Sequence, residues 1–296
     1  MPYDTLIHNG LIVTVNPAFE IIESGILGMA DGCIVHLEKG TSEKPIPEAF
    51  ETIDAQGAIV MPGLVNTHTH LPMTLFRGFA DDLPLSEWLF ERIFPAEARF
   101  LDANTVYWGT LLGCLEMIAS GTTCVVDGYF FQDATVEAME RSGLRALIAQ
   151  GVIDFPAPGV PTPEDNLVVG RAFLDRWSGF SERIRPGLFC HSPSTCSERT
   201  LRGALEISQS FGSPLQTHLS ETAGEVEEIV RRTGTRPVTY LDRIGVLTDD
   251  LIAAHAVHLD AEEIGLLAER RVRVAHVPES NMKLASGAAP VHAFLE

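Results

Sequence analysis

The feature that most constrains the fold is a regular alternation that begins near residue 60. Short runs rich in β-branched residues alternate with amphipathic segments of helical length, which is the pattern of parallel βαβ units. The expected strands cover 59–66, 122–127, 144–153, 184–191, 214–218, 251–255 and 272–276. The expected helices lie near 102–120, 133–142, 164–178, 198–211, 222–233, 260–270 and 288–295. The pattern therefore predicts an α/β fold of the (β/α)8 barrel type.

Two parts of the chain are expected from this pattern. Residues 1–60 consist of short apolar runs and turn signals, with Asn9-Gly10 and Asp31-Gly32 as expected hairpin turns. They predict a small N-terminal β-sandwich part. Residues 61–296 predict a distorted TIM barrel that is incomplete at its C-terminus, because the sequence ends in the seventh expected helix. Strands one and seven are then expected to have open edges.

Composition limits the possible partners and locations. The 296 residues include 40 acidic and 21 basic residues, so a net charge of −19 argues against a nucleic-acid ligand. No apolar stretch is long enough to cross a membrane, and no signal segment is recognisable at the N-terminus, so we expect a cytoplasmic protein. The five cysteines are expected to be free thiols, because their number is odd and none forms a C-x-x-C pair.

Polar side chains that can bind metal follow several of the expected strands. Histidines occur in Asn66–His70, at His191, at His218, at His255 and at His276. Because the strands of a barrel end at the same face, these side chains are expected to meet where such folds build their active sites.

The pair His68 and His70 is the clearest metal motif. Residues two apart in an extended segment point to the same face, and neutral imidazole is a natural zinc ligand. An H-x-H pair alone is weak evidence and often lies on a strand surface. Its place at the end of the first barrel strand, with His218 and His255 ending two later strands, favours a zinc site. Such a site lowers the pKa of a bound water to about 7.

Two further residues are candidates for proton transfer beside that site. Glu221 lies three residues after His218, where partial desolvation would let it donate a proton. His255 is expected to hydrogen-bond the water and the developing tetrahedral centre. The alternatives are a first-turn helix carboxylate for Glu221 and a core histidine for His255.

Four segments of the chain closely resemble the metal-dependent amidohydrolase superfamily. They are MPGLVNTHTHLPMTLFRGFADDLPLSEW (61–88), HSPSTCS (191–197), THLSE (217–221) and VPESNMKLASG (277–287). Within that superfamily the chain is most similar to the branch of 5-methylthioadenosine/S-adenosylhomocysteine deaminases, to which triazine hydrolases are also related. The resemblance covers essentially the whole chain and implies a composite β-sandwich around a distorted TIM barrel.

The resemblance also implies roles for individual residues. One divalent ion, usually zinc, would be held by His68, His70 and His218. Glu221 would contact the purine and move protons, and His255 would lie beside the attacking water. The remaining implied pocket residues are Glu97, which would bind ribose hydroxyls, and Trp88 and His191, which would line the pocket. The implied reaction replaces the C6 amino group of an adenosine-type nucleoside by hydroxide and releases ammonia, and the implied full-length protein is a homo-oligomer.

Two departures from the family pattern bear on activity. The deaminases carry arginine after strand three where this chain has Gln150, which leaves a different amino-purine or an amino-triazine as possible substrates. The family's strand-eight aspartate, a metal ligand and proton carrier, has no counterpart before residue 296. We therefore predict that these 296 residues alone have little or no activity. The alternatives to a nucleoside deaminase are a triazine-type amino or chloro hydrolase and an inactive metal-binding remnant.

Overall fold

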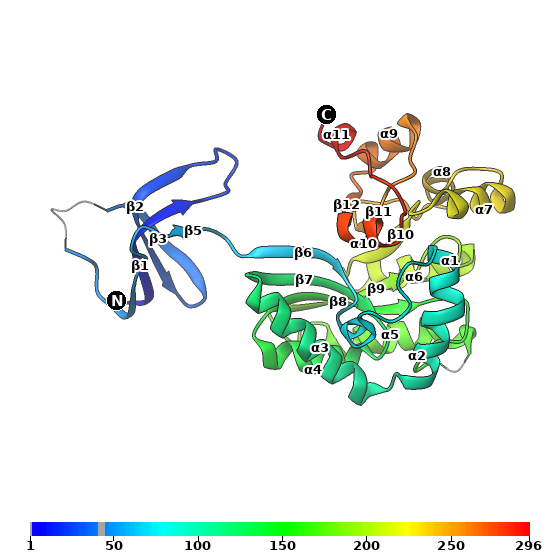
Figure 1. Ribbon diagram of the computed structural model, residues 1–296, viewed down its shortest axis with the longest axis horizontal. Coiled ribbons are helices and arrows are strands. Elements are labelled where there is room, and N and C mark those ends of the chain that lie inside the picture. Colours follow the sequence, from blue (N-terminus) through cyan, green and yellow to red (C-terminus); the bar gives the residue numbers. More distant parts are fainter. Residues whose placement is uncertain (1, 41–44, 161) are drawn as a thin grey trace. The chain divides into compact units, whose positions relative to one another are not determined.

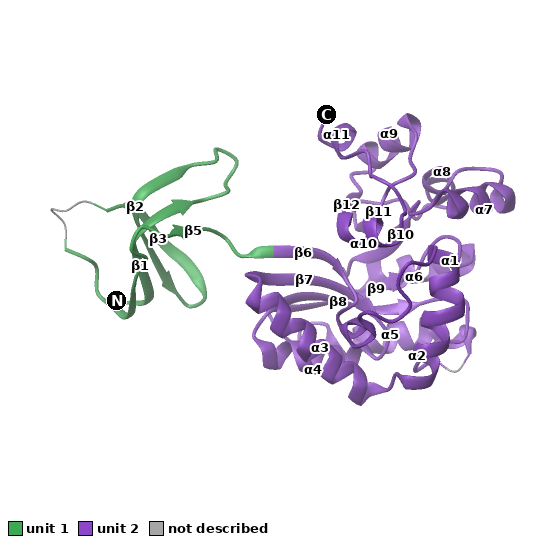
Figure 2. Cartoon of the chain, viewed as in Figure 1, with its two compact units in different colours: residues 1–64 green, residues 65–296 purple. Residues whose placement is uncertain are grey.

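The structure is a computed structural model that describes residues 2–40, 45–160 and 162–296. The chain forms two compact units, residues 1–64 and residues 65–296 (Figure 2).

The first unit is a five-stranded sheet (Figure 1). Its strands are β1 (Tyr3–Val13), β2 (Ile21–Ala30), β3 (Cys33–Lys39), β4 (Ala49–Asp54) and β5 (Ile59–Val60). The order is β3-β2-β1-β4, and β5 also pairs with β1. Strands β1, β2 and β3 pair antiparallel, whereas β4 and β5 run parallel to β1.

One of the two expected hairpin turns is confirmed, and the other is wrong. Asp31 and Gly32 connect β2 to β3, with φ of 51° and 72°, as a two-residue turn between antiparallel strands requires. Asn9 and Gly10 instead lie inside β1, where Asn9 has φ of 56° and the pairing register with β2 shifts. Both halves of β1 pair with β2, so the left-handed residue produces a bulge in a continuous strand.

The second unit contains the predicted alternation of strands and helices. Its sheet has the order β12-β11-β10-β9-β8-β7-β6, and neighbours from β7 to β12 run parallel. The strands are β6 (Leu64–Thr69), β7 (Thr122–Tyr129), β8 (Arg145–Val152), β9 (Ile184–Cys190), β10 (Leu215–Leu219), β11 (Leu251–His255) and β12 (Arg273–Ala275). The predicted α/β fold of incomplete-barrel type is therefore confirmed, with β6 and β12 as the outer strands of the described sheet.

Helices connect these strands in the order that the sequence predicts. The main connecting helices are α3 (Ala103–Ala119), α4 (Gln132–Ser142), α5 (Asn166–Trp177), α6 (Glu198–Ser210), α7 (Ala223–Thr233) and α9 (Ala261–Glu269). The last predicted helix, α11 (Val291–Leu295), follows β12. Side-chain caps fix the first residues of several of these helices. Asp102 and Thr105, for example, form a reciprocal capping box at the first turn of α3.

Several short helices were not predicted. They are η1 (Leu71–Phe76), α1 (Leu85–Glu87), the π-helix η2 (Trp88–Ile93), α2 (Phe94–Phe100), α8 (Pro237–Arg243) and α10 (Pro278–Lys283). The short η3 (Pro163–Asp165) falls at the start of the helix expected near 164–178 and leads into α5. Most are too short for a periodic pattern to be visible in the sequence. Between β6 and α3 they build one wall of the cavity described below.

Buried apolar side chains form the interior of the second unit. Ile148, Leu188 and Leu215 lie on three neighbouring strands and are completely buried, and helix residues such as Leu174 pack into the same cluster. This interior supports the strands whose carboxyl ends carry the polar residues.

Candidate metal centre and pocket

Five histidines gather at the carboxyl ends of the strands. This histidine cluster consists of His68, His70, His191, His218 and His255. The His68 ring lies 4.8 Å from that of His70, 5.0 Å from that of His218 and 5.3 Å from that of His255, centroid to centroid. The His191 ring lies 5.0 Å from that of His218. The expected convergence is thus present for these five histidines, whereas His276, just after β12, is exposed and does not line the cavity described below.

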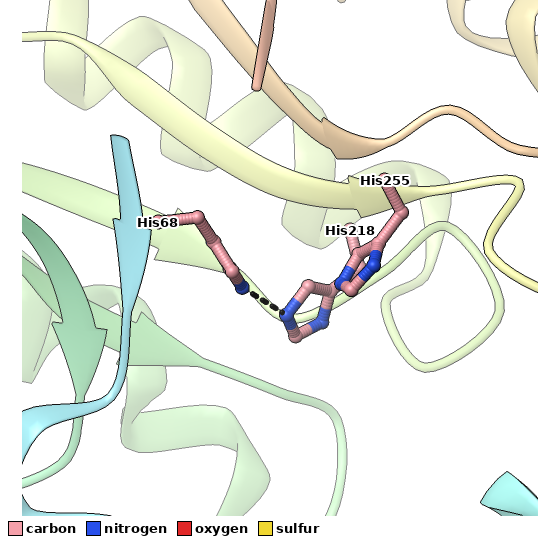
Figure 3. Close-up of side chains that lie close together, drawn as sticks. All are labelled: His68, His218 and His255. Atoms are coloured by element: carbon pink, nitrogen blue, oxygen red, sulfur yellow. Dashed lines mark hydrogen bonds between the residues drawn. The ribbon is translucent and has the colours of Figure 1, made fainter. Parts of the chain in front are cut away.

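Three of these histidines bring nitrogen atoms close enough to share one ion. One ring nitrogen each of His68, His218 and His255 lies within 4.8 Å of the others (Figure 3). The Nε2 atoms of His68 and His218 are 3.2 Å apart. Two nitrogens bound at 2.0–2.1 Å to one tetrahedral zinc ion would be separated by about 3.3 Å, so this donor pair fits such an ion.

His70 lies beside this group with one ring nitrogen occupied. Its Nδ1 donates to the backbone carbonyl of Gly128 at 2.5 Å. A hydrogen bond of this kind fixes the ring and leaves the lone pair on Nε2, as is usual for metal-binding histidines. The sequence assigned His70 to the ion and His255 to the water, and the roles of both remain predictions.

The cluster favours neutral imidazoles. Removal of water around the ring lowers the pKa of His68 and of His218 well below the usual value, and the neighbouring histidines lower each pKa further. Burial also lowers the pKa of His70 to about 4 and that of His191 to about 3. Near neutral pH these four rings are therefore unprotonated, which is the form that binds a metal ion.

The backbone is strained where β10 and β11 end. Ser220, His255 and Ala256 have φ of 50°, 74° and 48°, in the left-handed region that side chains other than glycine rarely adopt. Hydrogen bonds hold this conformation, including that from the Ala256 amide to the Leu219 carbonyl at 3.0 Å. Such strain commonly occurs at functional sites, where the surrounding structure keeps a side chain in a required direction.

Glu221 is buried next to the cluster. Its Oε2 lies 3.6 Å from His255 Nε2, and its Oε1 accepts a hydrogen bond of 3.1 Å from the Ser286 hydroxyl. The Glu221 backbone amide donates to Oε2 of Glu225 at 2.8 Å. Burial raises the pKa of Glu225 to about 8, so this second carboxyl is mostly protonated near neutral pH.

A cavity of about 1190 Å³ opens over the histidine cluster. Its lining brings together all the residues that the sequence predicted for the site: His68, His70, Trp88, Glu97, His191, His218, Glu221 and His255. Aromatic rings supply much of the remaining wall, including Phe90, Phe94 and Phe155. The individual roles of these residues are still predictions.

Glu97 has a partner that sequence reasoning missed. The Tyr129 hydroxyl donates to Glu97 Oε1 at 2.5 Å, and both side chains are buried. Burial raises the pKa of Glu97 to about 7, although the hydrogen bond from Tyr129 opposes this change. Tyr129 ends β7 just after Asp127 and Gly128, so its position at a strand end was the available signal.

Asp127, near the end of β7, and Gln150, where the sequence departs from the family pattern, do not line this cavity. The Asp127 carboxylate accepts from the Leu71 amide and from the Gln132 side chain, which joins β7 to η1 and α4. The side-chain oxygen of Gln150 accepts a hydrogen bond of 3.3 Å from the backbone N–H of Gln132. Both side chains thus have structural partners around the first turn of α4, away from the cavity lining.

Comparisons with known proteins establish the family. The model of the amidohydrolase family matches residues 59–296. The chain belongs to the amidohydrolase family. A 5-methylthioadenosine/S-adenosylhomocysteine deaminase of Syntrophobacter fumaroxidans is 44% identical over 99% of this chain and 66% of its own length. A 5'-deoxyadenosine deaminase of Methanosarcina mazei is 45% identical over 99% of this chain and 66% of its own length. This amidohydrolase chain therefore spans just under two thirds of these relatives.

Solved structures confirm the amidohydrolase fold. An adenosine deaminase of Xanthomonas campestris with bound zinc matches with a TM-score of 0.95 and 37% identity, over 99% of this chain and 67% of the other. A triazine hydrolase from Arthrobacter aurescens matches with a TM-score of 0.90 and 21% identity, over 98% and 69%, and at that identity supports only the fold. Among the described residues of this amidohydrolase, no helix is long and apolar enough to span a membrane.

Proposed function

We propose that this chain is the catalytic part of a metal-dependent amidohydrolase that deaminates adenosine-type nucleosides such as 5-methylthioadenosine. The observation that carries the proposal is the meeting of neutral histidines, a buried glutamate and a second buried carboxyl, Glu97, in one cavity. The names of the relatives at 44–45% identity and of the zinc-bearing structure support the same activity.

A divalent ion, most simply Zn²⁺, would be held by His68 and His218 together with a third histidine. His70 is the third ligand that the family resemblance implies, whereas His255 has a ring nitrogen within 4.8 Å of those of His68 and His218. Bound there, the ion would make a water molecule acidic enough to act as a nucleophile near neutral pH. The zinc content of His70→Ala and of His255→Ala separates these alternatives. The variant that lacks the third ligand should lose more metal than the other.

The remaining residues would bind the substrate and move protons. Glu221 would hold the purine edge and transfer a proton to the ring nitrogen, while His255, 3.6 Å away, would orient the attacking water. A C–O bond would form at C6 and the C–N bond would break. Of the two protons of the attacking water, one would end on the ring nitrogen and the other on the departing amino group, which leaves as ammonia. Trp88 and His191 would line the base and sugar positions, and Glu97 would accept hydrogen bonds from the ribose hydroxyls.

The Glu97–Tyr129 pair favours a ribose-bearing substrate over an amino-triazine. A buried carboxylate that faces a cavity needs hydrogen-bond donors, and a ribose supplies two hydroxyls, whereas a triazine has none at the corresponding position. Glu97→Ala should therefore reduce kcat/KM for nucleosides about 100-fold and leave any triazine turnover nearly unchanged.

An ammonia-release assay tests the proposed function. The protein expressed from its complete coding sequence, loaded with Zn²⁺, would be offered 5-methylthioadenosine, 5'-deoxyadenosine, S-adenosylhomocysteine, adenosine, guanine and a melamine-type triazine. Deamination of the adenosine derivatives is the expected result. Turnover of the triazine alone, or of no compound, would contradict the proposal. The same assay on the 296 residues tests the prediction that they have little activity by themselves.

A further inference from the structure

Helix α10 and the loop after it contain two buried polar side chains, Asn281 and Ser286, that lie outside the cavity lining. We call residues 278–287 the α10 segment. Other residues of this segment, including Met282 and Leu284, line the cavity. A backbone hydrogen bond of 2.8 Å from the Ser286 N–H to the main-chain carbonyl of Asn281 joins the two buried positions. The segment thus contributes some residues to the cavity wall, while Asn281 and Ser286 are buried beneath it.

Asn281 contacts the ring of His255. Its Oδ1 lies 2.8 Å from His255 Nδ1, and both residues are buried. A carbonyl oxygen can only accept, so Nδ1 carries the hydrogen in this arrangement. His255 Nε2, which lies 3.6 Å from Glu221 and close to His68 and His218, then has its lone pair free. One amide oxygen thus determines which nitrogen of His255 can accept a proton or bind an ion.

Ser286 contacts the other proposed proton carrier. Its hydroxyl donates to Glu221 Oε1 at 3.1 Å, which leaves Oε2 toward His255. The Ser286 carbonyl accepts a hydrogen bond of 2.7 Å from His258 Nε2, three residues after the end of β11. The loop is therefore fastened to the strand that carries His255, and His255 and Glu221 are held from the same short segment.

We propose that Asn281 and Ser286 are positioning residues for the active site. Asn281 keeps His255 in the Nδ1–H tautomer with a fixed ring direction, and Ser286 keeps one oxygen of Glu221 directed at His255. The catalytic consequence rests on the proposed function, because it assumes that His255 and Glu221 act on the substrate. The assignment of the tautomer does not depend on any activity.

The rival arrangement has the Asn281 amide turned over. Its Nδ2 would then donate to His255 Nδ1, and the ring hydrogen would lie on Nε2, facing Glu221. In the structure Nδ2 is buried and has no hydrogen-bond partner within the described residues. Turning the amide over would pair Nδ2 with His255 and leave Oδ1 without a partner instead, so the buried Nδ2 does not decide between the two arrangements. The two arrangements predict opposite tautomers and can be told apart directly.

Nuclear magnetic resonance of the metal-free full-length protein tests the tautomer without any catalysis. With ¹³C- and ¹⁵N-labelled histidine, the His255 signals, assigned by their loss in His255→Asn, should report the Nδ1–H form. Asn281→Asp, which keeps an oxygen acceptor, should preserve this form. Asn281→Leu, which has a similar size and no acceptor, should shift His255 to the Nε2–H form. An Nε2–H signal in the unchanged protein, or no shift in Asn281→Leu, would overturn the proposal.

Kinetics of the zinc-loaded protein test the consequence for catalysis. Asn281→Leu should lower kcat about 10–100-fold with little change in KM, and Asn281→Asp should restore most of the rate. Ser286→Ala should also lower kcat, and Ser286→Thr, which keeps the hydroxyl, should recover it. The matched control is Glu279→Gln, an exposed change in the same helix. A merely structural role would instead lower the melting temperature of both Asn281→Leu and Asn281→Asp and reduce the amount of folded enzyme, while kcat per folded molecule and the His255 tautomer stay unchanged.

Failure of the proposed function has a different signature. If the unchanged protein releases no ammonia from any nucleoside, the function is wrong, while the tautomer measurement still decides the role of Asn281. If the protein is active and Asn281→Leu has the kcat of the control, the function stands and the positioning role is wrong.

Discussion

Two regions of the second unit differ in what they bury: the apolar interior between strands and helices, here called the body, and the cavity at the carboxyl ends of the strands, here called the mouth. In the body, apolar side chains such as Ile148, Leu188 and Leu215 are buried against each other. At the mouth, buried positions hold polar groups such as Glu221 and His255, and Ser220, His255 and Ala256 have left-handed backbone conformations. Apolar burial favours folding, whereas buried ionisable groups and backbone strain oppose it. The difference indicates that the body supplies the stability on which the mouth depends.

The mouth also contains ionisable groups whose pKa values are shifted by burial. At the mouth, burial shifts both kinds of group toward their neutral forms. It lowers the pKa of His70 to about 4 and raises the pKa of Glu97 to about 7 and that of Glu225 to about 8. Changes at the mouth should therefore alter activity and pH dependence, and changes in the body should alter stability.

The largest effect is expected from loss of a shared metal ligand. His218→Ala should abolish measurable metal binding and lower kcat/KM by at least about 1000-fold, with a smaller change in stability. Metal content after dialysis and ammonia release would be measured together. His292→Ala is the control, because its side chain is 90% exposed. Retention of full zinc content by His218→Ala would break the assignment of the mouth as a metal site.

The next largest effect on activity is expected from removal of the Glu221 carboxyl group. Glu221→Gln keeps the size of the side chain and removes the transferable proton, so kcat should fall about 10²–10⁴-fold while zinc remains bound. Glu227→Gln, an exposed change in the neighbouring helix α7, is the control. Equal rates for the two variants would show that Glu221 has no part in proton transfer.

In the body, a cavity-forming change should affect stability alone. Leu174 is fully buried in α5, and Leu174→Ala should lower the free energy of unfolding by about 2–5 kcal/mol. Val168→Ala in the same helix is the control, since Val168 is 66% exposed. Urea titrations give the stability, and kcat per folded molecule should stay within about twofold. A large loss of kcat in folded Leu174→Ala would show that body and mouth are not separable.

The smallest effect is a pH dependence of stability at Glu225. The folded protein holds this proton up to about pH 8, whereas the unfolded chain releases it near its ordinary pKa of 4.5. The native state therefore binds more protons in this window, and stability falls as pH rises. Between pH 6 and 8 the unchanged protein should lose about 2 kcal/mol relative to Glu225→Gln. Parallel urea curves for the two proteins over this range would contradict the assignment.

Sequence reasoning succeeded where the signal was local. The strand 251–255 was predicted with both of its ends correct, because a short apolar run bounded by turn residues has few alternative structures. It failed at Asn9-Gly10, where pairing of both halves of β1 with β2 keeps the strand continuous despite a strong turn signal. It also missed η2 and α10, because helices of six residues show little periodicity.

The sequence alone determined the family, the alternation of strands and helices and the histidines at the strand ends. Those features follow from residue type and spacing along the chain. Only the tertiary structure decided which nitrogens meet, that Tyr129 donates to Glu97 and that Asn281 and Ser286 hold His255 and Glu221. These contacts join residues 26 to 65 positions apart, so their geometry depends on how the strands and the α10 segment pack.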